Sequence, residues 1–372
     1  MSSAIDWLSD LKNTGACKAY AAGEVIFREG DPGELMYVIL NGEVQVTLEK
    51  LPINYLVEGS IFGEMALVDN SPRSASAVAA TDCILLPLDQ TQFKALIPSH
   101  PEFSVEVMSV MAQRLRRSIE TTLQRQRMEE ELIISREIQL SLLPLQCPEI
   151  SGWEVAAYYR AARQVGGDLY DFIQTSEAPN LLHLVVADVT GKGVPAALYM
   201  AVSRTILRTA TQFDSCPAQI LRRTNQTILQ DVGYRLFLST FFASLNTQTG
   251  HFIYANGGHE WPMLYRADTG TVQNLDTSGL LLGVFRDMEF PQTELFLAPG
   301  DVLVLFTDGV TEARDATGDF FGEERLAEIL AQTGDKSARQ LMEDITQAVG
   351  LFTGETPQAD DLTLIVLKRK PG

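Results

Sequence analysis

The chain has 372 residues, and 29 lysines and arginines against 48 aspartates and glutamates give it a formal net charge of −19. Single cores stop growing at roughly 250 to 300 residues, so two domains are expected, and the negative charge argues against nucleic acid or an anionic membrane surface as the partner. Four widely spaced cysteines, the lack of a leader-like start and the lack of roughly 18 consecutive apolar residues predict a cytoplasmic chain without disulfides, zinc sites or membrane spans.

The first predicted elements are short strands between Lys18 and Leu88. Runs such as VIF, LMYVIL and VQVTL are rich in β-branched and aromatic residues, and glycines stand between them. This pattern is typical of a small antiparallel barrel or roll.

Within this region, the segment from Ile61 to Ala77, IFGEMALVDNSPRSASA, has the parts of a phosphate-binding site. A helix start is expected after Gly63, and the backbone N–H groups at a helix N-terminus favour anions. The guanidinium of Arg73 can donate paired hydrogen bonds to an anionic oxygen, and the carboxylate of Glu64 can accept one from a sugar hydroxyl. The alternative interpretation is a β-turn with a surface ion pair.

FGEMAL followed by PRSA resembles the phosphate-binding cassette of cyclic-nucleotide-binding domains, and GEVIFREGDPGELMYVILNGEVQV resembles their first strands, over Cys17 to Phe103. The resemblance implies that Glu64 binds the ribose 2′-hydroxyl and that Arg73 with Ser74 holds the cyclic phosphate. Ser74 stands where cGMP-preferring relatives often carry Thr, which favours cAMP. The implied ligand-binding residues are Phe62, Gly63, Glu64, Met65, Ala66, Arg73, Ser74 and Ala75.

Residues 102–143 are expected to form one long linker helix or two collinear ones, because glycine is absent and apolar residues recur at helical spacing until Pro144. A homodimer through this helix is expected, although the charged stretch RQRMEEE interrupts the apolar stripe and leaves a coiled coil unsettled. Hydroxyls near its start could cap the nucleotide base or simply face solvent. The apolar positions are Met108, Met111, Leu115, Ile119, Leu132, Ile133, Ile138 and Leu142, and the hydroxyl residues are Ser118, Thr121 and Thr122.

Beyond Pro148, apolar strands alternate with amphipathic helical stretches. Strands are expected at LLHLVVAD, TFFASLN, HFIYANGG, DVLVLFTDG and LTLIVLKR, and helices at VPAALYMAVSRTILRTA, PAQILRRTNQTILQDV and ARQLMEDITQAVG. Several strands end in Asp or Gly. The natural interpretation is a layered α+β domain with carboxylates collected at the strand ends.

Four acidic motifs stand at these strand ends: GGDLYD, VVADVTGKG, LFTDGVTE and QADDLTL. Hard divalent cations such as Mg²⁺ and Mn²⁺ take oxygen ligands, and a pair of ions needs several carboxylates from different parts of the fold. Any one of these residues could instead be a helix N-cap or a turn residue, but the set of four favours a metal site. The acidic residues are Asp168, Asp171, Asp188, Asp308, Asp360 and Asp361.

The order and the sequences of these motifs resemble the metal-dependent phosphatase superfamily, in its bacterial SpoIIE-type branch, from Ile138 to Lys370. IQLSLLP, GKGVPAAL, YANGGHEWPML and FTDGVTEARDATGDFFG carry the resemblance along with the acidic motifs. It implies a β-sandwich, two central β-sheets flanked by helices, with two Mn²⁺ or Mg²⁺ ions that activate a water to attack the phosphorus of phosphoserine or phosphothreonine in a protein. The substrate could be a small antagonist of an anti-sigma factor.

The resemblance also implies a role for each acidic residue. Asp188 bridges both ions, the Val189 carbonyl joins one of them, Asp308 and Asp360 complete the other, and Asp168 binds directly or through water. Asp361 is the spare member of its pair and Asp171 orders its loop. Arg163 either holds the phosphate or is an ordinary charged strand end, and His259 is expected to make a structural hydrogen bond in a hairpin.

The sequence therefore predicts three parts: a sensor at 1–101 built as an antiparallel β-roll with flanking helices, a linker helix at 102–143, and a phosphatase at 144–372. The expected activity is a phosphatase that a cyclic nucleotide switches through the helix, in a direction that stays open. One alternative is a catalytically inactive, ligand-controlled protein-binding module. Another is a phosphatase with a structural roll that binds no ligand.

Overall fold

The chain is described here from a computed structural model. The structure describes residues 17–49, 51–65, 71–99, 101–176, 178–231 and 236–371. It divides into two compact units, Met1–Arg127 and Met128–Gly372, each of which is considered by itself.

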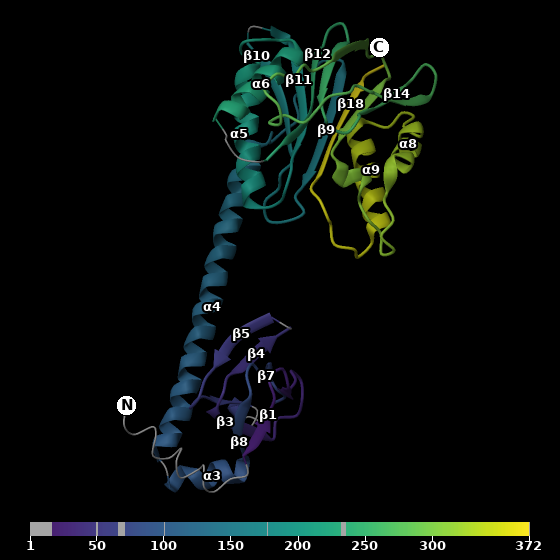
Figure 1. Ribbon diagram of the computed structural model, residues 1–372. Helices are drawn as coiled ribbons and strands as arrows, with labels where there is room; N and C mark the ends of the chain where they lie inside the picture. The colour runs from purple at the N-terminus through teal and green to yellow at the C-terminus, as the bar shows by residue number, and fades with distance from the viewer. Residues whose placement is uncertain are drawn as a thin grey trace. The chain divides into compact units, whose positions relative to one another are not determined.

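The described strands of the N-terminal unit form two antiparallel sheets, with the strand orders β1-β8-β3-β6 and β2-β7-β4-β5. Together the sheets make the predicted antiparallel roll (Figure 1). The strands are β1 (Lys18–Tyr20), β2 (Val25–Phe27), β3 (Leu35–Asn41), β4 (Val44–Leu48), β5 (Leu51–Leu56), β6 (Ile61–Phe62), β7 (Ser76–Ala79) and β8 (Cys83–Asp89).

Strand β3 shows why this unit has two small cores. Its side chains alternate between the two faces of the sheet. Met36 and Val38 pack with Phe103 of the following helix, whereas Tyr37 and Ile39 pack between the sheets. The continuous apolar run LMYVIL is therefore explained by cover on both faces.

Two described helices follow the roll, α3 (Gln90–Ser99) and α4 (Pro101–Leu142). The sequence left open one long helix or two collinear ones, and the structure has a single helix, α4, with Pro144 just beyond its end. It starts within the first compact unit and ends within the second. The division at residues 101 and 143 stays our proposal for the domain boundaries.

The C-terminal unit contains two five-stranded antiparallel sheets, with the orders β10-β11-β12-β13-β16 and β15-β14-β17-β18-β9. The strands are β9 (Trp153–Arg160), β10 (Leu169–Thr175), β11 (Ala178–Val189), β12 (Leu238–Asn246), β13 (His251–Gly257), β14 (Met263–Arg266), β15 (Thr271–Asn274), β16 (Gln292–Phe296), β17 (Val302–Phe306) and β18 (Leu362–Arg369).

Helices cover the outer face of each sheet (Figure 1). Helices α5 (Val194–Ala210) and α6 (Pro217–Asp231) lie on the first sheet, and α8 (Gly322–Ala331) and α9 (Ala338–Thr353) on the second. A short helix, α7 (Asp308–Thr311), follows β17. This arrangement confirms the predicted α+β sandwich.

Strand β18 separates the two cores of this unit. Ile365 and Leu367 point into the core between the sheets, which continues under α5 and α6. Leu364 and Val366 point to the other side, into the core under α8 and α9. Since both faces are buried, the strand is continuously apolar from Leu364 to Leu367. No helix in the described ranges is long and apolar enough to cross a membrane.

Candidate active site and ligand pocket

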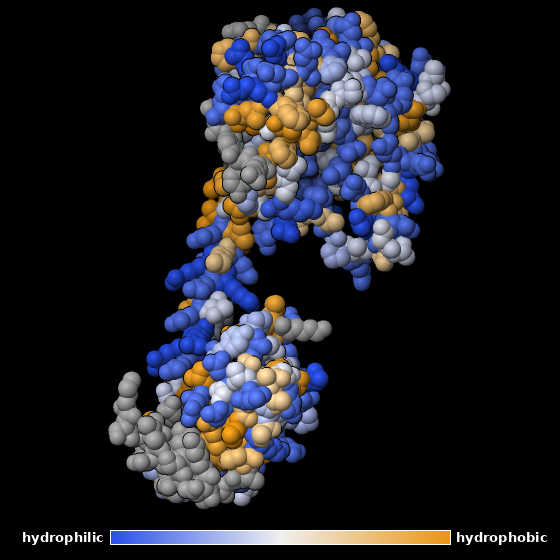
Figure 2. Space-filling model, viewed as in Figure 1, coloured by the Kyte–Doolittle hydropathy of each residue, from blue (hydrophilic) through white to orange (hydrophobic). Residues whose placement is uncertain are grey.

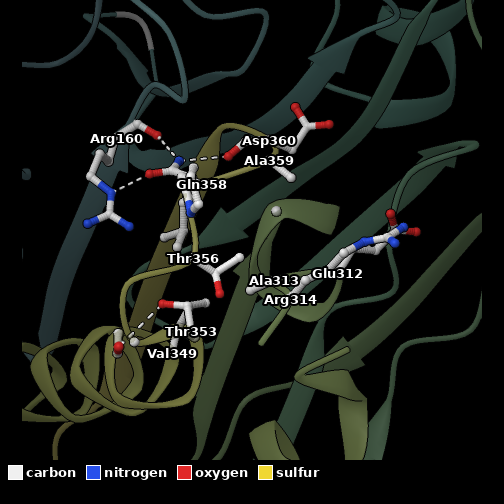
Figure 3. A pocket seen from close by; sticks show the side chains of 15 residues that line it. Arg160, Glu312, Ala313, Arg314, Val349, Thr353, Thr356, Gln358, Ala359 and Asp360 are labelled. Carbon is white, nitrogen blue, oxygen red and sulfur yellow. Dashed lines mark hydrogen bonds between the residues drawn. The ribbon is translucent and has the colours of Figure 1, made fainter. Parts of the chain in front are cut away.

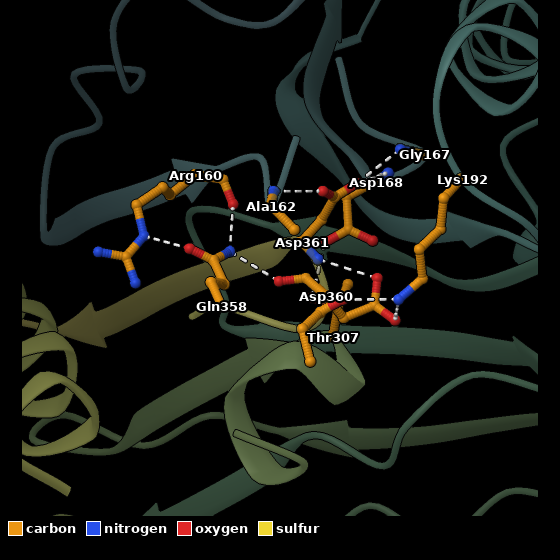
Figure 4. A network of polar contacts seen from close by, with 10 residues as sticks. Arg160, Ala162, Gly167, Asp168, Lys192, Thr307, Gln358, Asp360 and Asp361 are labelled. Carbon is orange, nitrogen blue, oxygen red and sulfur yellow. Dashed lines mark hydrogen bonds and ion pairs between the residues drawn. The ribbon is translucent and has the colours of Figure 1, made fainter. Parts of the chain in front are cut away.

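The predicted acidic residues come from the ends of facing strands. Asp168 precedes β10 and Asp188 lies near the end of the adjacent β11, in the first sheet. Asp308 follows β17 and Asp360 precedes the adjacent β18, in the second sheet. The sandwich thereby collects carboxylates from both sheets, and Figure 4 shows Asp168 and Asp360 in this network.

The carboxylates lie close enough to affect one another. Burial raises the pKa of Asp188 to about 7, and the neighbouring Asp308 adds to the shift. Burial, with Asp360 next, raises the pKa of Asp308 to about 6. The pKa of Asp168 is well above its ordinary value because of burial and because Asp188 and Asp361 lie near. Hard divalent cations bind oxygen ligands, and a group of carboxylates with little positive charge nearby suits such ions.

Asp168 is the most deeply held of these carboxylates. Its Oδ2 accepts hydrogen bonds from Thr307 Oγ1 at 2.7 Å and Thr363 Oγ1 at 2.5 Å. The two threonines come from the ends of β17 and β18, so they join the first sheet to the second through one carboxylate. Sequence reasoning missed both, although each stands beside a predicted acid in LFTDG and DDLT.

The adjacent acids Asp360 and Asp361 have different surroundings (Figure 4). Asp361 is buried, and its carboxylate accepts from the backbone N–H of Ala162 at 2.7 Å and of Gly167 at 2.6 Å. It therefore fixes the loop that carries Asp168. The side chain of Asp360 is 37% exposed and bonds to Lys192. Asp360 thus keeps the better claim to a metal ion.

The Val189 carbonyl also faces the Asp168 loop. A Cβ atom on Gly167 would lie 2.9 Å from the Val189 carbonyl oxygen and 3.4 Å from Asp188 Oδ1, so only glycine fits there. As the described side chains stand, no three acidic, histidine or cysteine residues are set around one ion. The bonds from Thr307, Thr363 and Lys192 occupy carboxylate oxygens that an ion would need.

Two further predicted residues serve structure. Asp171 is buried and pairs with Arg208 at 2.5 Å and Arg204 at 3.1 Å, both on α5. His259 is buried, its Nδ1 lies 2.9 Å from Ser239 Oγ, and burial lowers its pKa to about 4. A neutral histidine within this hairpin agrees with the structural hydrogen bond that we expected.

Arg163 is not brought to the cluster by any contact in the structure. It is exposed between β9 and β10, and among the described residues it makes no hydrogen bond or ion pair with the acidic group. Arg160 is linked to this region through Gln358, since its Nε donates to Gln358 Oε1 at 2.5 Å and Gln358 Nε2 donates to the Asp360 carbonyl at 2.6 Å. A phosphate-holding role for Arg163 stays a prediction.

A cavity of about 510 Å³ adjoins Asp360 (Figure 3). The end of α9 and the segment between α9 and β18 line it, with Arg160 on one side and Glu312 and Arg314 on the other. Of the acidic residues proposed as metal ligands, Asp360 lines this cavity.

The N-terminal unit has its own cavity of about 300 Å³. Seven of the eight predicted ligand-binding residues line it, while Ala66 lies outside the described residues. Helix α4 contributes Arg114 and Arg117, which the sequence analysis did not single out. Thr121 and Thr122 bond back to carbonyls of their own helix and do not line this cavity.

Glu64 and Arg73 are held in place in this pocket, but each has a polar atom to spare. Arg73 donates to the Gly63 carbonyl at 2.8 Å and the Leu35 carbonyl at 2.5 Å, and its guanidinium stacks on Phe27. Glu64 pairs with Arg114. Arg73 Nε and Glu64 Oε2 are buried and have no partner among the described groups. One free donor and one free acceptor fit a ligand with an anionic phosphate and a hydroxyl.

Comparison with known proteins identifies both units. The family description "Cyclic nucleotide-binding domain" matches residues 17–100, and "Stage II sporulation protein E (SpoIIE)" matches residues 178–370. Phosphoserine phosphatase RsbU of Bacillus subtilis is 31% identical over 293 residues, which cover 77% of this chain and 86% of RsbU. The cAMP-dependent protein kinase regulatory subunit of Eremothecium gossypii is 43% identical over 82 residues, which cover 22% of this chain and 18% of that one.

Among solved structures, the SiaA-PP2C domain of Pseudomonas aeruginosa matches with a TM-score of 0.59 and 22% identity, over 66% of this chain and 98% of that domain. This likeness supports the fold. The chain belongs to the SpoIIE family of PP2C-type, metal-dependent serine/threonine protein phosphatases, and a cyclic nucleotide-binding domain precedes its catalytic domain.

Proposed function

We propose that the chain removes phosphate from phosphoserine or phosphothreonine in a regulatory protein and that cAMP controls this activity. The observation that carries the proposal is the collection of Asp188, Asp308 and Asp360 from two facing sheets, where each acts on the charge of the next. Two Mn²⁺ or Mg²⁺ ions held there would supply an activated water and offset the charge of the phosphate.

In this proposal each metal-binding residue has its own role. Asp188 would hold both ions, with the Val189 carbonyl beside it, and Asp308 and Asp360 would hold one ion from the opposite sheet. Asp168 keeps its orientation through two threonine hydroxyls, and binds directly or through water. Asp361 stabilises the loop that carries Asp168, so we propose Asp360 rather than Asp361 as the metal ligand.

The family and the cavity support a proposal for the substrate. RsbU is named a phosphoserine phosphatase. The cavity beside Asp360 is open and polar, with Arg160, Glu312 and Arg314 in its lining, which suits a segment of another protein. We propose a phosphoprotein substrate, for example an antagonist of an anti-sigma factor, in the cytoplasm, where widely spaced thiols stay reduced.

Regulation by the nucleotide is supported at both ends of α4. At its start, Arg114 pairs with Glu64, the residue proposed to bind the ribose. Near its end, the buried Gln139 bonds to Gly166, two residues before Asp168. A ligand that competes with Arg114 for Glu64 would therefore act on the helix that contacts the catalytic loop.

The experiment measures Mn²⁺-dependent hydrolysis of p-nitrophenyl phosphate and of a phosphoserine peptide, with and without cAMP or cGMP. Asp188→Asn should lower turnover at least about a hundredfold, because it removes the bridging charge. Asp268→Asn, an exposed turn residue, is the matched control and should keep wild-type turnover.

The same assay tests the switch. Wild-type turnover should change when cAMP is added, and the response should be lost in Arg73→Ala, with equilibrium dialysis reporting nucleotide binding directly. If hydrolysis does not change with either nucleotide and dialysis detects no binding, the N-terminal roll has a structural role and binds no ligand. No hydrolysis under any condition would favour a protein-binding module.

A further inference from the structure

Lys192 is a basic side chain placed against the acidic cluster. Its Nζ donates to Asp360 Oδ2 at 2.8 Å and to the Ala359 carbonyl at 2.6 Å (Figure 4). No other lysine or arginine in the described ranges pairs with Asp168, Asp188, Asp308 or Asp360. Among the described residues, the ion pair between Lys192 and Asp360 is therefore the one that brings a basic side chain to these four carboxylates.

The turn that carries Lys192 joins β11 to α5. Gly191 has a φ of 94° and Gly193 a φ of 79°, both in the left-handed region that favours glycine. Lys192 stands between these two glycines, four residues after Asp188 and just before the N-terminus of α5. The lysine side chain is 40% exposed, so its four-carbon stem can turn without leaving a buried charge behind.

A metal ion and Lys192 would compete for the same oxygen. An ion bound to Asp360 would compete with the ammonium for the carboxylate and would repel the ammonium at short range. The released ammonium would remain tethered four residues after Asp188, where it would be available to a phosphate dianion, since lysine binds phosphate as a point charge. Arg163, the candidate from the sequence, has no contact with the cluster, whereas Lys192 touches a proposed ligand.

We propose that Lys192 holds Asp360 in the ion-free protein and binds the substrate phosphate when ions are present. The inference rests on the proposed phosphatase function and adds a phosphate-binding residue to it. It gives one side chain opposite effects on two ligands, because Lys192 opposes metal binding and favours phosphate binding.

The test measures the binding of Mn²⁺ and of inorganic phosphate in the Mn²⁺-loaded protein by calorimetry, alongside kcat and KM for the phosphoserine peptide. Lys192→Gln should bind Mn²⁺ about threefold to tenfold more tightly, since the competing charge is gone. It should bind phosphate about tenfold more weakly, with a matching rise in KM. Lys192→Arg should restore phosphate binding.

The matched control is Lys336→Gln, which removes a lysine with the same 2.8 Å ion pair and similar exposure, far from the acidic motifs in sequence. It should leave both affinities unchanged. Weaker or equal Mn²⁺ binding in Lys192→Gln, or unchanged phosphate binding, overturns the proposal. If the wild type binds both ligands but hydrolyses neither substrate, the proposed function fails, while the two affinities still decide the role of Lys192.

Discussion

At the scale of single residues, Asp171 shows how an acidic motif can serve the fold. Its side chain is 1% exposed and pairs with Arg204 and Arg208, so two positive charges on α5 depend on it. Asp171→Asn should lower the free energy of unfolding by about 2 to 3 kcal/mol, because it leaves these charges without a full partner. Urea denaturation measures the change.

The control for Asp171 is Asp344→Asn, which breaks the ion pair of an exposed lysine and aspartate and should cost less than about 1 kcal/mol. The affinity for Mn²⁺ should be the same in Asp171→Asn as in the wild type. A stable variant that has lost Mn²⁺ binding would instead place Asp171 among the metal ligands.

The sequence allowed the acidic residues to be predicted because they stand next to apolar strand patterns. Each predicted carboxylate directly adjoins an apolar strand, and opposite sheets bring these strand ends together. The partners of Asp168 could not be predicted in the same way, since Thr307 and Thr363 lie 139 and 195 residues away along the chain. Which oxygen meets which hydroxyl depends on how the two sheets pack.

At the scale of elements, the end of helix α4 is joined to the catalytic loop by Gln139. This side chain is 4% exposed. Its Nε2 donates to the Gly166 carbonyl at 2.6 Å, and its Oε1 accepts from the Gly166 N–H at 3.0 Å. A Cβ atom on Gly166 would lie 2.3 Å from Asp361 Oδ2, so the position has no room for a larger residue.

Gln139→Leu should leave both backbone groups of Gly166 unpaired and loosen Asp168. We expect the Mn²⁺ concentration for half-maximal activity to rise about tenfold, with KM for the peptide unchanged and activity partly restored by excess Mn²⁺. Gln126→Leu, exposed on the same helix, is the control. Equal Mn²⁺ titration curves for Gln139→Leu and the wild type would show that the contact does not position the loop.

Residue patterns predicted about half of the described helices and strands, and the linker helix expected at 102–143 is observed as Pro101–Leu142. Helix α8 was not singled out, although its buried Leu326 and Leu330 have helical spacing. With ten residues, α8 offers only two buried positions of this kind, which is a weak periodic signal. The use of α4 as a wall of the ligand pocket needed the tertiary structure, because Arg114 and Arg117 look like ordinary solvated residues in the sequence.

At the scale of the whole molecule, helix α4 carries a series of apolar side chains that its own chain leaves exposed. Leu115 is 62% exposed and Ile119 is 50% exposed, for example. Figure 2 shows apolar side chains on this helix with hydrophilic ones between them. The exposed apolar residues are Val105, Met108, Leu115, Ile119, Leu123, Met128, Ile133, Ile134, Ile138 and Leu140.

We propose that a second copy of the chain covers this series, since apolar residues repeated every three or four positions, as Leu115, Ile119 and Leu123 are, form the face that a paired helix presents to its partner. Sedimentation equilibrium should therefore find a homodimer at micromolar concentration. Leu115→Glu with Ile119→Glu should raise the dissociation constant at least about a hundredfold, because each copy would bury two unpaired carboxylates. Gln124→Glu adds a charge at an exposed polar position of the same helix and should leave the dimer intact. A monomeric wild type, or a double variant that still dimerises, would move the interface away from α4, and the switch would then have to operate within one chain.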